Sequence, residues 1–186
     1  MASLKNISIE VLRQLLRYDP ETGKIFWKYR SEEFFTDGVQ SAKHNAAKWN
    51  NKYANAEALT FLSKGYLTGS ILRKYALAHR VSYALYHGEW PNNIDHINHN
   101  KSDNRIKNLR SVTKAENSKN LGMNKGNASG FNGVSWDKSK SRWAVKIHAN
   151  GKRINLGYYI DLNAAIAARE DANMKYNFHP NNGCAA

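Results

Sequence analysis

The amino-acid sequence predicts an α+β protein made of two small domains. Short stretches of alternating apolar and polar residues, typical of strands, occur on both sides of residues 121–132, a segment rich in Gly and Asn. Patterns with helical spacing also occur on both sides, at residues 8–18 and 162–176. Because 186 residues can form one or two small cores, we expect domains at residues 1–120 and 133–180, joined by a flexible linker at 121–132.

The composition indicates a polyanionic partner. The formal net charge is +13, and both predicted domains carry more basic than acidic side chains, so nucleic acid is the leading candidate. No membrane partner is expected, because the chain has neither a basic amphipathic helix nor an apolar run close to about 18 residues. Cys184 is the single cysteine and the first twenty residues lack the apolar core of a signal peptide, so we expect a protein that works inside a cell.

The first part of the chain contains ordinary structural patterns. Apolar residues at helical spacing behind Ser8 predict a helix over 8–18. Residues 31–55 leave two interpretations open: a loop or loose helix that lies on DNA, and a solvated insertion. Trp27 is expected in the core and His79 in structural hydrogen bonds. The other predicted elements are a turn at 19–23, a strand at 24–27, a hairpin of 65–69 with 73–77, and a helix at 79–87 that ends at the Gly88–Pro91 break.

Residues 94–120 concentrate more polar chemistry than a packed core requires. Residues 94–97 and 109–112 are predicted to be short strands joined by a polar loop at 99–107. Thr113 and Glu116 have the T-x-x-E spacing of a capping box, which places a helix start there. The expected unit is a strand, a loop, a second strand and a helix.

Within this stretch, Asp95-His96, Asn108-Leu109-Arg110 and Glu116-Asn117 resemble, in type and spacing, the HNH nucleases with a ββα-metal active site. The resemblance is to the phage homing-endonuclease branch in which the final His is replaced by Asn, and it implies a ββα-metal core at about residues 93–120. It implies that His96 is the general base, that Asp95 and Asn117 hold one divalent cation, and that Asn108 supports the loop carrying the base. Asn98-His99 stands where many relatives have Asp-Gly, so a stiffer loop is expected.

Elementary chemistry agrees with these implied roles. Hydrolysis of a phosphodiester needs a base near neutral pH, and an unperturbed imidazole titrates at about 6.5. The departing oxygen gains negative charge, which a hard cation on carboxylate and amide oxygens stabilises; such ligands favour Mg²⁺ or Mn²⁺. The alternative is structural, with His96 an ordinary strand histidine and Asp95 a turn residue.

The second domain is predicted to be a three-stranded antiparallel sheet packed on one helix. Three stretches alternate with period 2, and an alanine-rich helix follows behind an Asp161 cap. Trp143, Val145 and Ile147 should face the helix. The opposite face should carry side chains that can bind DNA, namely Arg142, Lys146, His148, Arg153 and Asn155.

The pattern G-V-x-W, W-x-V-x-I, G-K-x-x-x-L-G and A-A-x-A across about 45 residues is similar to the APETALA2-type DNA-binding domain, which implies docking of the sheet face on duplex DNA. Ser135 and Asp137 stand where that family favours Arg, so its base specificity is not carried over. A solvated face of a small protein-binding sheet is the alternative.

Together these features predict a metal-dependent, sequence-preferring DNA endonuclease of homing type that nicks duplex DNA as a monomer, without a protein partner. Arg110 and Lys114 are candidate phosphate contacts. A phage-encoded chain of this kind would act in the host cytoplasm. The rival interpretations are a non-catalytic DNA-binding regulator that retains the ββα scaffold and an RNA-binding module. The RNA-binding interpretation is disfavoured because the sequence predicts no exposed aromatic platform for single-stranded bases.

Overall fold

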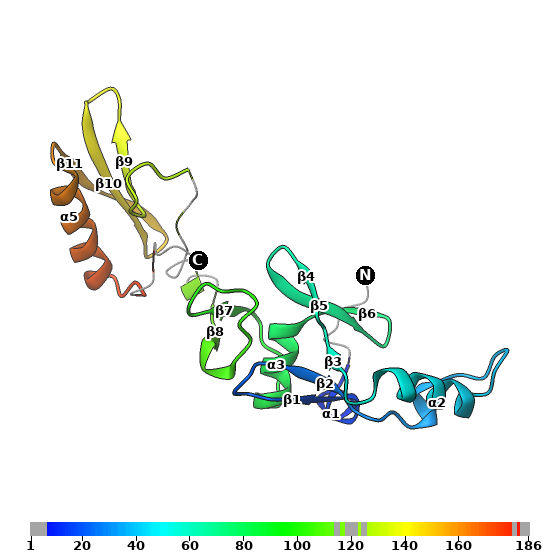
Figure 1. Ribbon diagram of the computed structural model, residues 1–186. Helices are drawn as coiled ribbons and strands as arrows, with labels where there is room; N and C mark the ends of the chain where they lie inside the picture. Colours follow the sequence, from blue (N-terminus) through cyan, green and yellow to red (C-terminus); the bar gives the residue numbers. More distant parts are fainter. Residues whose placement is uncertain (1–6, 114–115, 118–122, 124–125, 180–181, 183–186) are drawn as a thin grey trace. The chain divides into compact units, whose positions relative to one another are not determined.

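The computed structural model describes residues 7–113, 116–117, 123, 126–179 and 182 (Figure 1). The chain divides into two compact units, the first formed by Met1–His96 with Asn100–Ser111 and the second by Ile97–His99 with Val112–Ala186. Helices and several small antiparallel sheets make up both units, which confirms the α+β prediction.

The first unit begins with a helix that passes directly into a strand. Helix α1 (Ile9–Leu15) starts at Ser8, whose hydroxyl accepts a hydrogen bond from the Val11 N–H at 3.3 Å. The prediction that the helix continues to Tyr18 was wrong. Strand β1 (Leu16–Tyr18) instead pairs with β2 (Ile25–Trp27), and β3 (Glu57–Ala58) completes the sheet. Pairing with a strand that follows a tight turn overrides the local helical pattern.

Residues 31–55, whose structure the sequence left open, contain a short 3₁₀ helix and a regular α-helix. The 3₁₀ helix is η2 (Glu32–Phe34), and α2 (Ala42–Tyr53) begins at Ser41, which accepts from the His44 N–H at 3.2 Å. The buried Asn50 fixes α2 to the preceding chain, because its side chain exchanges two hydrogen bonds of 2.9 Å with the backbone of Arg30.

A three-stranded antiparallel sheet and a helix follow. The sheet is β4 (Phe61–Ser63), β5 (Tyr66–Ile71) and β6 (Lys74–Leu77), so the predicted hairpin is present. Helix α3 (Ala78–His87) follows β6 at once and ends at Gly88, which adopts a left-handed φ of +78°. The core of the first unit joins α1, α3 and the sheets around Leu12, Leu15, Ile25, Ile71, Ala76 and Val81.

The second unit has the predicted sheet and helix (Figure 1). Strands β9 (Val134–Asp137), β10 (Arg142–Ala149) and β11 (Lys152–Tyr159) are antiparallel, with β10 in the centre. Helix α5 (Leu162–Lys175) begins at Asp161, which accepts from the Ala164 N–H at 2.8 Å, and packs on the sheet. The small core comprises Val134, Val145 and Ala165.

The predicted linker at 121–132 lies partly outside the described residues. Its second half folds onto the sheet: the Ser129 hydroxyl lies 2.7 Å from the carbonyl oxygen of Val134, and Phe131 packs against the core. Among the residues that the structure describes, none of the helices combines the length and the apolarity that crossing a bilayer requires.

Candidate active site

Asp95 and His96 lie next to each other on a buried two-stranded ribbon of the first unit. Strand β7 (Ile94–His96) pairs with β8 (Leu109–Ser111), and η3 (Ile106–Asn108) leads into β8. Only 7% of Asp95 and 5% of His96 is exposed. Because successive strand residues point to opposite faces of the ribbon, the carboxylate and the imidazole meet different neighbours.

Arg110 is directly opposite Asp95 in the β7–β8 register and forms an ion pair with it. Its Nε and Nη2 both donate to Asp95 Oδ2, at 2.9 and 2.7 Å. Two donors on one oxygen fix the direction of the carboxylate and compensate part of its desolvation. The structure thus places Arg110, expected as a phosphate contact, on the neighbouring carboxylate.

The His96 ring is oriented by Asn104, at 3.3 Å between Nε2 and Oδ1. Since an amide oxygen only accepts, Nε2 carries the proton in this arrangement and the lone pair resides on Nδ1. Burial lowers the pKa of His96 below its usual value, while the hydrogen bond to Asn104 and the charge of Asp95 act in the opposite direction. At neutral pH the ring is therefore uncharged and able to accept a proton.

Two rings pack beside the His96 imidazole. The His79 ring lies edge-on to it, with centroids 5.1 Å apart, and the Tyr66 ring lies 6.0 Å away. Burial, and then the proximity of His96, lowers the pKa of His79 to about 3, so His79 remains neutral. Burial also raises the pKa of Tyr66. Two uncharged rings thus pack against one part of the candidate base.

Hydrogen bonds within residues 103–108 fix the second half of the loop between the two strands. Asn108, buried at 6% exposure, donates from Nδ2 to the carbonyl oxygen of Asp103 at 2.8 Å. Asp103 in turn accepts from Arg105 Nε at 2.7 Å. These contacts close the loop on itself and set the position of Asn104, which lies between Asp103 and Arg105.

The turn between β1 and β2 supports the same loop from outside. The Tyr18 hydroxyl donates to the Asn104 carbonyl oxygen at 2.7 Å, and the Ile106 N–H donates to the Pro20 carbonyl oxygen at 3.1 Å. Gly23 has a φ of +75°, and a Cβ built on it would lie 2.5 Å from the Arg105 backbone nitrogen. A side chain at this position would push the turn away from the loop.

Sequence reasoning did not single out Asn104, Tyr66 or Tyr18. The polar loop contains several asparagines, and only its folded path shows that Asn104 is the one that faces His96. The regular strand pairing, by contrast, would have indicated the Asp95–Arg110 pair once the register was known.

The predicted capping box forms at the start of the next helix. The Thr113 N–H donates to Glu116 Oε2 at 2.7 Å, and the Glu116 N–H donates to Thr113 Oγ1 at 3.2 Å. Asn117 donates its N–H to the Thr113 carbonyl oxygen at 2.9 Å and is assigned to the second unit. Lys114 lies outside the described residues.

The donors expected for a metal are one carboxylate and one amide. In the described ranges, no group of three or more His, Cys, Asp or Glu side chains could hold a metal ion. Asp95 is the carboxylate that the first unit presents beside His96.

The open sheet face of the second unit carries the residues predicted to bind DNA. In the β10–β11 register, Lys146 is opposite Asn155 and His148 is opposite Arg153, and three of these four side chains are exposed. Arg142 is also exposed, opposite Asp137 of β9.

Tyr158, which sequence reasoning missed, extends the open face of the sheet. It is opposite Ala144 in the strand register, and the Lys140 ammonium lies 3.6 Å from the centre of its ring. Simple alternation from Arg153 and Asn155 would have placed Tyr158 on the opposite face; the irregularity in the strand register at Val145 and Lys146 brings it to the open face.

Comparisons with known proteins agree with the position of the candidate site. Residues 76–119 match the family model described as HNH endonuclease. Protein 3.8 of Escherichia phage T7 is 40% identical over 62 residues, which cover 33% of this chain and 51% of that protein. The chain therefore spans about half the length of this curated relative. No solved structure matches the chain. An HNH endonuclease domain at residues 76–119, which include both strands of the ribbon and α3, supports nuclease activity in general.

Proposed function

We propose that the chain is a metal-dependent endonuclease that nicks duplex DNA, with His96 as the general base. The observation that carries the proposal is the buried Asp95–His96 pair, in which one residue is held by an arginine and the other is a neutral imidazole oriented by an amide. The match of residues 76–119 to the HNH endonuclease family supports DNA as the substrate.

In the proposed reaction, His96 Nδ1 accepts a proton from a water molecule as its oxygen attacks the phosphorus. The bond between phosphorus and the 3′ oxygen breaks and the departing oxygen takes a proton from solvent water, which leaves a 5′ phosphate and a 3′ hydroxyl group. The hydrogen bond to Asn104 holds the proton on Nε2 and so directs the lone pair. Asn108 acts as a positioning residue, because it closes the loop that carries Asn104.

Asp95 and Asn117 would hold one Mg²⁺ or Mn²⁺ ion. Their donors fit such a cation, since carboxylate and amide oxygens are hard ligands, and the two hydrogen bonds from Arg110 fix the Asp95 carboxylate in one direction. The bound cation would supply electrostatic stabilisation of the departing 3′ oxygen.

The second unit would supply binding and some sequence preference. We propose that an APETALA2-like domain at 133–180 lays its open sheet face on duplex DNA and that residues 1–120 form the nuclease domain. Exposed Arg142 and Arg153 offer positive charge and donors, and His148 and Asn155 offer polar side chains for base edges. With one such site in each chain, a homing-type monomer cuts one strand per visit.

A direct test is incubation of supercoiled plasmid and phage-genome DNA with the protein in Mg²⁺, Mn²⁺ or EDTA, beside His96→Ala. The proposal requires metal-dependent conversion to open circles that is lost by orders of magnitude in His96→Ala, while a gel shift on duplex DNA is retained.

One observation favours a second candidate, a non-catalytic DNA-binding regulator on the same scaffold: Arg110 already neutralises the carboxylate proposed to bind metal. Retained duplex binding without cleavage in any metal would support this candidate and contradict the nuclease proposal.

A further inference from the structure

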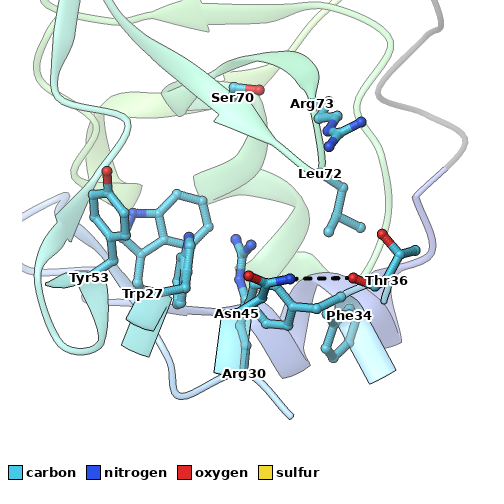
Figure 2. Close-up of a pocket in the computed structure, with 11 residues that line it drawn as sticks. Trp27, Arg30, Phe34, Thr36, Asn45, Tyr53, Ser70, Leu72 and Arg73 are labelled. Atoms are coloured by element: carbon cyan, nitrogen blue, oxygen red, sulfur yellow. Dashed lines mark hydrogen bonds between the residues drawn. The ribbon is translucent and has the colours of Figure 1, made fainter. Parts of the chain in front are cut away.

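The first unit has a recess that none of the residues of the Asp95–His96 site lines. It has a volume of about 800 Å³ and is lined by residues of β2, η2, α2 and the β5–β6 hairpin (Figure 2). That volume is typical of small-molecule sites, which range from about 300 to 1,000 Å³. None of its described lining residues is acidic. Its most distinctive lining residues are Trp27, Trp49, Tyr53 and Phe34 together with Arg30 and Arg73.

Arg30 is a buried cation whose charge is only partly compensated. Its guanidinium lies against two indoles, 4.5 Å from the centre of Trp27 and 3.9 Å from that of Trp49. Only 7% of the residue is exposed, and its Nε has no hydrogen-bond partner within the described part of the chain. No carboxylate of the described residues forms an ion pair with it. Burial lowers the pKa of Arg30 to about 10, so the group is still charged at neutral pH. An anion in the pocket would supply the missing acceptor.

The two hydrogen bonds between Arg30 and Asn50 involve the backbone of Arg30 and not its side chain, so the guanidinium takes no part in them. Figure 2 shows it reaching the pocket from one side and Arg73 from another. Two cations on different sides of one recess, Arg30 buried and Arg73 exposed, favour a ligand that carries negative charge.

Arg73 reaches the pocket through an unusual hairpin turn. Ile71 pairs with Lys74, so Leu72 and Arg73 form a two-residue loop, and both have positive φ, at +46° and +62°. Such a turn normally contains Asn-Gly, because a left-handed backbone costs about 1–2 kcal/mol for a residue with a larger side chain. Both side chains line the pocket, which is a reason for their presence in a turn that disfavours them.

The remaining wall can accept a flat ring. Tyr53 is the most exposed of the lining aromatic residues, at 36%, and its ring lies 5.3 Å from that of Trp49. Helix α2, which carries both, also bears Lys43, Lys48 and Lys52 and no acidic residue. Aromatic faces beside positive charge are the combination that binds a base and its phosphate.

We propose that this pocket binds a nucleotide, with its phosphate at Arg30 and Arg73 and its base against the aromatic wall. The same chemistry is offered by a free nucleotide and by an unpaired nucleotide of a DNA strand. Binding of an unpaired nucleotide within DNA rests on the proposed function, whereas binding of a free nucleotide does not.

The test compares the affinities of the full chain for two fluorescein-labelled duplexes, one fully paired and one with a single extra adenosine, measured by anisotropy. The proposal predicts about tenfold tighter binding of the duplex with the unpaired base. Arg73→Ala and Tyr53→Ala should remove this preference without weakening binding of the paired duplex. Lys74→Ala, which removes a charge from the same hairpin but not from the pocket, should keep it.

Competition by 5′-dAMP and by inorganic phosphate identifies the source and the chemistry. If the wild type binds dAMP and both pocket variants do not, the pocket is supported even when the two duplexes bind equally. The ligand is then a free nucleotide. Equal affinity for both duplexes with no dAMP binding would overturn the proposal, as would phosphate that competes as well as dAMP. Plasmid cleavage is measured separately, so a failure of the pocket proposal can be distinguished from a failure of the nuclease proposal.

Discussion

Gly23→Ala tests whether the β1–β2 turn positions the loop that carries Asn104. The residue has a φ of +75°, and a Cβ there would lie 2.5 Å from the Arg105 nitrogen and 2.6 Å from the Asn104 carbonyl carbon. Since carbon atoms in proteins do not approach so closely, the turn must move away by about half an ångström or more. Both atoms that block the Cβ belong to the backbone, so no side chain can rotate out of the way.

The magnitude follows from two terms. The left-handed conformation costs about 1–2 kcal/mol for alanine. Displacement also weakens the hydrogen bonds from Tyr18 to Asn104 and from Ile106 to Pro20, each worth about 0.5–1.5 kcal/mol. Gly88→Ala is the matched control, because Gly88 has a φ of +78° but faces only a flexible arginine side chain, at 3.4 Å. The difference between the variants isolates the effect of the loop.

Thermal unfolding followed by circular dichroism and single-turnover nicking of plasmid DNA measure the two consequences. Gly23→Ala should melt about 5 °C or more below Gly88→Ala. Its nicking rate should fall on the order of 10²-fold, since a displaced Asn104 no longer orients His96. If the two variants melt and cleave alike, the turn does not position the loop and the reasoning is refuted.

Three further predictions address the base, its surroundings and the sheet. In pH–rate profiles, the midpoint of the acidic limb should lie below about 6.5, and Asn104→Ala should move it lower still, because the lost hydrogen bond raises the pKa of His96; an unchanged midpoint would contradict this role. His79 has a folded-state pKa of about 3, below its unfolded value, so its contribution to stability is present above pH 6.5 and is lost by up to about 1.4 kcal/mol per pH unit as the pH falls towards 3. The free energy of unfolding, measured with urea, should fall less steeply with falling pH between pH 6.5 and 4.5 in His79→Gln than in the wild type. Arg153→Ala should weaken binding of all duplex sequences and lower the slope of log K against log salt by about 1; an unchanged slope would exclude a phosphate contact by this exposed arginine.

Local patterns predicted the elements that rely on neighbours in the sequence. The Thr113–Glu116 capping box and the Asp161 cap form as expected, because each satisfies backbone groups only three residues away. The strands of the second unit follow from their alternation, and the turn at Asn150-Gly151 has the positive φ values that this pair favours.

Features decided by tertiary contacts could not be predicted in the same way. Leu15 and Leu16 both fit a helical stripe, yet Leu16 pairs with Trp27 in a sheet. Helix α2 has few apolar residues of its own; it is held by the buried Asn50 and by Trp49, which packs edge-on against Trp27. These contacts join residues twenty or more positions apart or across a turn, and no local pattern encodes them.

The candidate site also combines features that local sequence patterns predict with features that tertiary contacts decide. The adjacency of Asp95 and His96 and the strand that carries them are local features. The assignment of Asn104 to His96 and of Arg110 to Asp95 depends on the loop path and on the strand register, which emerge only in the folded unit.

The most direct test of the central claim is chemical rescue of His96→Ala in plasmid nicking with Mg²⁺ or Mn²⁺. Replacement of the buried ring by a methyl group leaves space beside Asn104, which free imidazole can enter. If His96 is the base, cleavage by the variant should be lost by orders of magnitude and partly restored by imidazole at constant pH and ionic strength, but not in EDTA. Cleavage by His96→Ala at the wild-type rate would show that the reaction does not use this imidazole.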